Sequence, residues 1–229
     1  MKTIIVTGAS GNMGQAVVKK FLIKGFRVIG TTVPNDPVKI EIEDANFETV
    51  MVDLMKDDDA EKFVAAMVSK YENIEAVVLT VGGFALGKIA DTKTGDIEKQ
   101  YKLNFETAYN IARPAFAHMM EKKTGRIFLI GSRPGMNATD GKGMIAYGLA
   151  KSLLFRLAAL MNEESKGTNV VTSVIVPSTI DTPPNRKSMP DADFDTWVKP
   201  EAIADVIYFY CTEEAAVLRE PVIKVYNNS

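Results

Sequence analysis

The chain has 229 residues, 46% of them hydrophobic, which is enough apolar material for a substantial core. Its formal net charge of -2, with both signs mixed, leaves no basic stripe and argues against nucleic acid or a membrane surface as a partner. The only cysteine, Cys211, excludes an internal disulfide, and the only histidine, His118, leaves no cluster suited to a structural zinc. The sequence shows neither a signal-peptide pattern nor an apolar run of about 18 residues, so we expect a soluble, cytoplasmic protein.

The first fourteen residues carry the strongest local pattern. A β-branched run, Lys2–Val6, leads directly into a turn that contains Gly8, Gly11 and Gly14, and a helix pattern follows. Gly8 suits a sharp turn, Gly11 lets the main chain approach a pyrophosphate, and Gly14 lets the helix pack near the strand. Backbone amides at the start of that helix would face the phosphates of a dinucleotide. The spacing Gly-x-x-Gly-x-x-Gly also fits an ordinary tight turn between strand and helix.

Strand and helix patterns then alternate along the rest of the chain. Short apolar runs predict strands, and apolar residues three and four apart predict helices. The predicted strands are Lys2–Val6, Phe26–Val33, Phe47–Val52, Ile74–Val81, Arg126–Gly131, Asn169–Val176 and Pro221–Tyr226. The predicted helices are Gln15–Lys24, Asp57–Tyr71, Asp96–Glu121 with a kink at Pro114, Met144–Glu164 and Pro200–Cys211.

This alternation predicts an α/β fold with a single domain over residues 1–229. Right-handed crossovers would give a Rossmann-type, doubly wound parallel sheet of about seven strands with helices on both faces. Ligands would bind at the carboxyl ends of the strands.

Tyr147 and Lys151 lie four residues apart on the longest predicted helix, which puts the phenol and the ammonium group on one face. A free tyrosine has a pKa of about 10, and a neighbouring lysine and an oxidised nicotinamide would both lower it. Tyr147 could then act as a general acid in a reduction. Such a pair also arises by chance on helices, but this one follows a strand that ends in Gly131-Ser132, in a chain that opens with a nucleotide turn.

With these motifs the sequence resembles the short-chain dehydrogenase/reductase family, and the resemblance covers nearly the whole chain. The motifs that carry it are the glycine turn, Asp53, Gly82-Gly83, Asn104 in Lys-Leu-Asn, Ser132, Tyr147 with Lys151, and Pro177 to Thr182.

The resemblance implies a role for each catalytic residue. Ser132 would bind the substrate oxygen and Tyr147 would donate the proton. Lys151 would hold the nicotinamide ribose and lower the pKa of Tyr147, and Asn104 would support a water-linked proton relay. Viewed alone, Asn104 also fits an ordinary polar residue of a helix.

The resemblance also implies a binding site for NAD or NADP. Asp53 would border the adenine pocket, although it also fits a simple cap at a strand end, and Gly82 and Gly83 would lie against the cofactor. The predicted cofactor-binding residues are Gly8, Ser10, Gly11, Asn12, Met13, Gly14, Thr32, Asp53, Leu54, Gly82, Gly83, Tyr147, Lys151, Pro177, Ile180 and Thr182. The choice between the two cofactors stays open, because Thr32 at the end of the second strand is neither acid nor base, and Asp36 could fold back toward the site or away from it.

Two stretches, residues 143–151 and 181–197, resemble the dihydropteridine reductase branch of the family. The second stretch predicts a substrate lid at residues 181–198, and the alternative is a polar surface loop anchored by two aromatic residues. The predicted lid residues are Asn185, Arg186, Met189, Phe194 and Trp197. The animal-type enzymes of that branch lack the serine and asparagine that this chain carries as Ser132 and Asn104.

The favoured function is therefore an NAD(P)H-dependent reductase of a small molecule, with a quinonoid dihydropterin as the preferred substrate. The alternatives are a reductase of another carbonyl or imine, which Ser132 and Asn104 favour, and a non-catalytic redox sensor, which the glycine spacing and Met13 also resemble. The resemblance further implies a homodimer or homotetramer paired through residues 108–120 and 153–161. Phe116, Met119, Leu154 and Phe155 fit either that interface or a buried helix face.

Overall fold

Seven parallel strands form one sheet at the centre of the computed structural model, which describes residues 1–38 and 40–228. The strand order is β3-β2-β1-β4-β5-β6-β7, with β1 near the middle. The strands are β1 (Thr3–Thr7), β2 (Arg27–Thr32), β3 (Phe47–Met51), β4 (Ala76–Leu79), β5 (Thr124–Ile130), β6 (Asn169–Pro177) and β7 (Val222–Val225). The predicted doubly wound sheet is confirmed.

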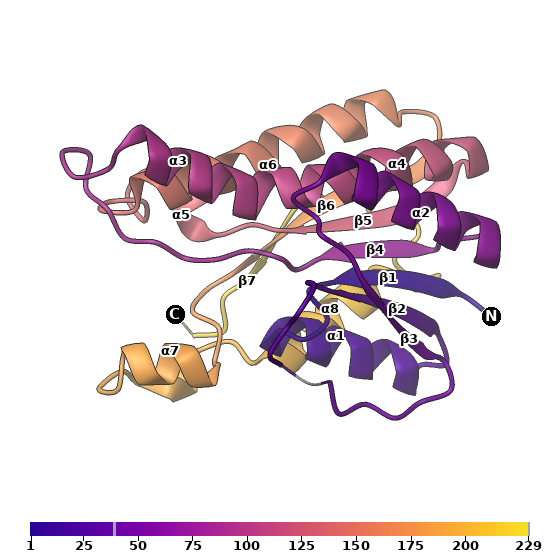
Figure 1. Ribbon diagram of the computed structural model, residues 1–229, viewed down its shortest axis with the longest axis horizontal. Helices are drawn as coiled ribbons and strands as arrows, with labels where there is room; N and C mark the ends of the chain where they lie inside the picture. The colour runs from indigo at the N-terminus through magenta and orange to yellow at the C-terminus, as the bar shows by residue number, and fades with distance from the viewer. Residues whose placement is uncertain (39, 229) are drawn as a thin grey trace.

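Helices cover both faces of the sheet (Figure 1). The longer helices are α1 (Asn12–Ile23), α2 (Asp57–Tyr71), α3 (Thr94–Tyr101), α4 (Thr107–Lys122), α6 (Ile145–Glu164) and α8 (Pro200–Phe209). One apolar core joins α2, α4 and α6 to the sheet and contains Phe63, Met119 and Leu154, and the other joins α1 and α8 and contains Phe21 and Ile203. No helix in the described part of the chain is long and apolar enough to cross a membrane.

The long helix predicted at residues 96–121 departs from α geometry, but not at Pro114. Helix α4 continues through Pro114, whereas a π-helical turn, η1 (Lys102–Glu106), separates α4 from α3. The predicted kink is therefore replaced by a π turn twelve to eight residues earlier, and this turn contains Asn104. A π turn inside a helix commonly marks a functional site.

Three short helices were not predicted, namely α5 (Arg133–Met136), α7 (Pro183–Ser188) and the 3₁₀ turn η2 (Phe194–Thr196). Ser132 and Thr182 accept backbone hydrogen bonds at the starts of α5 and α7, and prolines occupy the first turn of both helices. Both helices follow the carboxyl end of a strand, so they surround the edge of the sheet at which ligands bind in this class of fold.

Candidate active site

The glycine turn has the close packing that the sequence predicts. Gly8 has φ +61°, in the left-handed region, and the Gly11 amide donates to the Gly8 carbonyl at 3.0 Å. A Cβ placed on Gly14 would lie 2.1 Å from the Gly8 carbonyl oxygen. Side chains are therefore excluded at Gly14 by contact and at Gly8 by backbone conformation. Helix α1 begins at Asn12, so its first amides lie beside this turn.

The turn is tied to the neighbouring strands by hydrogen bonds. The Ala9 amide donates to the Thr31 carbonyl at 2.9 Å. Thr80 donates through its hydroxyl to the Thr7 carbonyl at 2.6 Å, and its amide donates to the Thr7 hydroxyl at 3.1 Å. The carboxyl ends of β1, β2 and β4 are thus fixed relative to one another, which gives a ligand a rigid edge to bind.

Asn104 is fully buried in the π turn and holds the segment after β4. Its side-chain amide donates to the Gly83 carbonyl and accepts from the Gly83 amide, both at 3.0 Å, and it also donates to the Gln100 side chain at 2.9 Å. A Cβ on Gly82 would lie 2.7 Å from Asn104 Oδ1 and 3.2 Å from Lys151 Nζ. The structure thus brings Asn104, Lys151 and the two glycines together. The Asn104 side chain uses its hydrogen bonds to hold Gly83 and Gln100.

Tyr147 and Lys151 both lie on the first turns of α6. Lys151 is buried and donates to the Ile130 carbonyl at 2.7 Å, and its Nζ lies 6.0 Å from the centroid of the Tyr147 ring. Burial lowers the pKa of Lys151 to about 8. The lysine is therefore held at the end of β5, and within the described residues it has no carboxylate partner.

Ser132 caps helix α5 and is hydrogen-bonded to Tyr147. Burial raises the pKa of Tyr147 above its usual value, and the hydrogen bond with Ser132 lowers it by less. The expectation that Lys151 lowers this pKa is not met by the chain alone, because the Lys151 ammonium is directed to the Ile130 carbonyl. The phenol is thus protonated at neutral pH, the form that a general acid requires.

The sequence does not decide whether Asp36 folds toward the cofactor site or away from it. In the structure Asp36 folds back onto the glycine turn. Its carboxylate accepts hydrogen bonds from the Ser10 hydroxyl and from the Val38 amide. These two hydrogen bonds hold the pKa of Asp36 below its usual value, so the group is ionised. A negative charge therefore lies beside the cofactor turn, a few residues beyond the end of β2.

The remaining predicted cofactor residues lie at the carboxyl edge of the sheet. Asp53 accepts from the Met55 amide at 3.1 Å and so caps the turn after β3, and Leu54 is buried with its carbonyl bonded to Asn110. Thr32 and Pro177 end their strands. Ile180 pairs with Val198, and Thr182 begins helix α7.

Phe84 was missed by sequence reasoning. It follows Gly82-Gly83, is 61% exposed, and meets the Tyr147 ring edge to face with centroids 5.2 Å apart. The loop that carries it is pinned to the start of α6, because the Gly87 amide donates to the Gly143 carbonyl at 2.7 Å. Its only signal in the sequence is a large apolar residue in a glycine-rich loop, where nothing else requires one.

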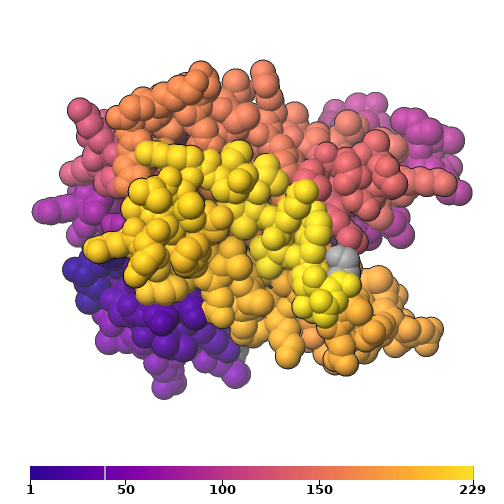
Figure 2. Space-filling view, turned by 180° about the vertical axis from the view of Figure 1, so that it is seen from behind, coloured from indigo at the N-terminus to yellow at the C-terminus, as the bar shows by residue number. Residues whose placement is uncertain are grey.

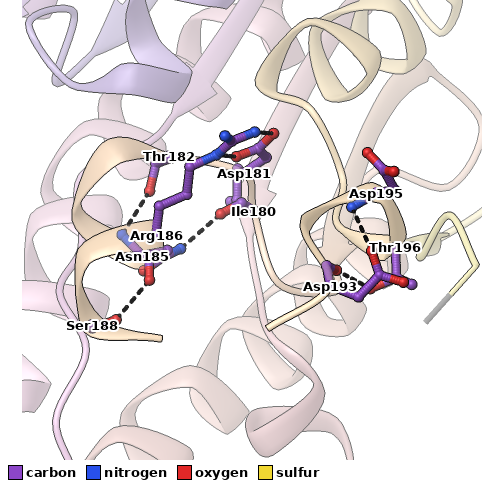
Figure 3. A network of polar contacts seen from close by, with 9 residues as sticks. All are labelled: Ile180, Asp181, Thr182, Asn185, Arg186, Ser188, Asp193, Asp195 and Thr196. Carbon is purple, nitrogen blue, oxygen red and sulfur yellow. Dashed lines mark hydrogen bonds and ion pairs between the residues drawn. The ribbon is translucent and has the colours of Figure 1, made fainter. Parts of the chain in front are cut away.

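The predicted lid residues form a compact group of their own at the same edge of the sheet, on the side of α1 and α8 (Figure 1). Figure 3 shows Arg186 reaching Asp181, and Asn185 donating to the Ile180 carbonyl at 2.8 Å. Trp197 is buried, and Met189 is exposed. The segment is therefore internally organised, and the packing of Phe194 on Trp197 agrees both with the predicted lid and with a surface loop anchored by these two residues.

Fold and site together define a nucleotide-binding oxidoreductase, with a glycine turn at β1 and a tyrosine–lysine pair on α6. The family model for short chain dehydrogenases matches residues 2–193, and the chain belongs to this family. It is accordingly an oxidoreductase that uses NAD or NADP.

Several characterised and uncharacterised relatives are similar along much of their length. An uncharacterized oxidoreductase of Bacillus subtilis, YvrD, is 30% identical over 180 residues, which is 77% of this chain and 67% of that protein. A dihydropteridine reductase of Dictyostelium discoideum is 29% identical over 220 residues, or 92% of this chain and 88% of that one. The solved structure of ElxO with NADP bound has a TM-score of 0.88 at 20% identity, covering 98% of this chain and 96% of that one, and supports the fold.

Proposed function

We propose that this oxidoreductase reduces a quinonoid dihydropterin or a closely similar planar ring. The observation that carries the proposal is Phe84, whose exposed ring stands beside the Tyr147 phenol. An aromatic wall next to the proton donor suits a flat heteroaromatic substrate, because stacked rings favour each other beyond the burial of their area. The similarity to the Dictyostelium dihydropteridine reductase supports the same substrate class.

In this proposal the protein orients the reactants and supplies one proton. Tyr147 would give its phenolic proton to the substrate, and a nicotinamide held by the glycine turn would supply the hydride, so that one hydride and one proton together complete a two-electron reduction. Ser132 holds the Tyr147 hydroxyl in place. Lys151 holds the cofactor ribose, and its charge then stabilises the phenolate left after proton transfer. Asn104 holds Gly83 in place with two hydrogen bonds and lies against Gly82, so that the main chain at these glycines stays open to the cofactor.

The test is the oxidation of NADH and NADPH by the purified protein with freshly generated quinonoid dihydropterin, in the wild type and in Phe84→Ala. We expect turnover by the wild type and a rise in the pterin KM of roughly tenfold in the variant, since a stacked aromatic contact is lost. Leu86→Ala, in the same loop and also exposed, is the control and should leave the KM unchanged. An unchanged pterin KM in Phe84→Ala would contradict the stacking of the substrate on Phe84. No pterin turnover by the wild type would contradict the proposed substrate.

A second candidate function is the reduction of another carbonyl or imine. The hydrogen bond between Ser132 and Tyr147 favours it, because two hydroxyl groups then converge on one substrate oxygen. Ketone reduction without pterin turnover would select this function.

We further propose that NADH is the preferred cofactor. The ionised Asp36 carboxylate, held by Ser10, would accept hydrogen bonds from the hydroxyls of the adenosine ribose and repel a 2′-phosphate.

Asp36→Asn should shift the ratio of kcat/KM for NADPH over NADH toward NADPH by about tenfold, since the repulsion is removed. Asp44→Asn is a matched control, because Asp44 lies in the same loop and caps a similar turn by accepting from the Asn46 amide at 2.8 Å. Steady-state rates with both cofactors measure the ratio. An equal shift in both variants, or none in Asp36→Asn, would contradict the proposal.

The assembly and the compartment complete the proposal. Met119 and Leu154 belong to the core, whereas the exposed apolar side chains on the helices expected to pair are Tyr109 of α4 and Leu149, Leu153 and Leu160 of α6. We propose a homodimer or homotetramer formed by these helices, which light scattering on the eluted protein would measure.

We also propose a cytoplasmic location, with which the single free cysteine is consistent.

A further inference from the structure

The lid segment is closed at its base by the main chain. Ile180 and Val198 form a parallel bridge, and the Asp181 amide donates to the Val198 carbonyl at 2.8 Å. The Val198 amide in turn donates to the Thr179 carbonyl at 2.9 Å. Residues 181–197 therefore leave the end of β6 and return to it, which is the geometry of a compact surface loop packed by its own side chains.

Inside this loop a single guanidinium joins the two halves. Arg186, on α7, binds the Asp181 carboxylate with two parallel hydrogen bonds, Nε to Oδ1 at 2.6 Å and an Nη to Oδ2 at 2.8 Å (Figure 3). The same guanidinium lies over the Phe194 ring, 4.6 Å from its centroid. Arginine suits both contacts at once, because its planar fork matches a carboxylate and its face stacks on an aromatic ring.

The second half of the loop is anchored in turn. Phe194 meets Trp197 edge to face at 4.9 Å, and Trp197 is only 6% exposed. The side-chain amide of Asn227 donates to the carbonyls of Asp195 and Trp197, both at 3.0 Å. Figure 2 shows the C-terminal segment, in yellow, meeting the orange lid segment on this side of the molecule. The contact of Arg186 with the Phe194 ring thus joins helix α7 to this anchored half.

We propose that the contact of Asp181, Arg186 and Phe194, here called the clasp, fixes α7 in place before substrate arrives and so sets substrate affinity. The inference rests on the proposed function, in which this segment covers the substrate. A segment that is ordered beforehand loses less conformational freedom when substrate binds. Arg186 is accordingly a positioning residue, and its loss should raise KM while leaving kcat nearly unchanged.

The first test measures the clasp without substrate. Hydrogen exchange of the α7 amides should become roughly fivefold faster in Arg186→Gln, the factor expected for the loss of one exposed ion pair and one cation–π contact. The increase should be smaller in Asp181→Asn, which removes the ion pair alone. The emission of Trp197, the only tryptophan, should change in Arg186→Gln because the Phe194 ring loses its partner. Lys187→Gln removes the same charge from the next position of the same helix and should change neither signal.

A double variant tests whether the clasp acts as one unit, and steady-state kinetics test whether it sets the pterin KM. Because Arg186→Gln already removes both contacts of the clasp, adding Asp181→Asn should make the exchange no faster than in Arg186→Gln alone. Arg186→Lys keeps the charge without the fork and should fall between wild type and Arg186→Gln. The pterin KM should rise with exchange in the same order, at constant kcat.

Additive exchange effects, or an equal effect of Lys187→Gln, would overturn the clasp. An unchanged KM in a variant whose helix exchanges faster would overturn its role in substrate affinity. Failure of the proposed function is a different result, namely the exchange changes predicted for each variant together with no pterin turnover in the wild type.

Discussion

Tyr147→Phe should reduce the rate of pterin reduction by between about 100-fold and 10,000-fold, the range that a positioned general acid supplies. The variant removes one hydroxyl and keeps the ring that packs against Phe84, so the fold and the aromatic wall stay intact. The phenol is the hydrogen-bond partner of Ser132. The Lys151 Nζ lies 6.0 Å from the centroid of the Tyr147 ring and donates to the Ile130 carbonyl, so we expect the phenol and not the ammonium to supply the proton.

The measurement is single-turnover kinetics beside a cofactor titration. Cofactor affinity should be nearly unchanged in Tyr147→Phe, so that the loss lies in the chemical step. Tyr101→Phe is the control and should keep the full rate, because Tyr101 is an exposed tyrosine whose ring lies tilted against Phe105. A rate in Tyr147→Phe within a few-fold of wild type would exclude the phenol as proton donor.

Gly14→Ala should lower the free energy of unfolding and abolish cofactor binding. The new Cβ would stand 2.1 Å from the Gly8 carbonyl oxygen and 2.9 Å from its carbon, and both are main-chain atoms that cannot rotate away. Either the strand end or the first turn of α1 must move, at a cost of about 3 kcal/mol. For a chain of this length that lowers the melting temperature by roughly 6 to 12 °C.

Gly95→Ala is the matched control. Gly95 lies near the start of α3, and a Cβ there has open space within 4 Å. Alanine is the better helix former, so this variant should be as stable as wild type or more so. Melting curves with and without NADH separate the two effects, since the cofactor should raise the melting temperature of Gly95→Ala but not of Gly14→Ala. A Gly14→Ala protein that melts and binds as wild type does would contradict the close packing.

Most of the fold can be predicted from the sequence because apolar runs, glycine positions and helical spacing are local patterns. Buried parallel strands are apolar runs, and the runs at residues 74–81 and 169–176 are almost uninterrupted, so β4 and β6 are recognised without the structure. The glycine turn is predicted for the same reason, since each glycine answers a local steric need. Tyr147 and Lys151 are found because helical spacing alone puts them on one face.

The rest depends on contacts between segments that are far apart in the sequence. A π turn has no spacing signature, so the break at Asn104 is visible only once the helix is built. Residues 33–46, between β2 and β3, have no period that fixes where Asp36 points, and only its bond to Ser10, 26 positions away, answers that question. The Asp181–Arg186 pair spans the start of a helix, where the three- and four-residue spacing rule does not apply.

The order of synthesis separates the two halves of the site in time. The glycine turn and the strands that hold it are complete within the first 80 residues, whereas the amide that anchors the lid belongs to Asn227. At the usual synthesis rate of about 5 to 20 residues per second, the first 80 residues are made roughly 7 to 30 s before Asn227. The segment proposed as the substrate lid can therefore be anchored only after the whole sheet, β7 included, has been made. A chain cut short before Asn227 would keep the residues of the glycine turn but lack the anchor of the proposed lid.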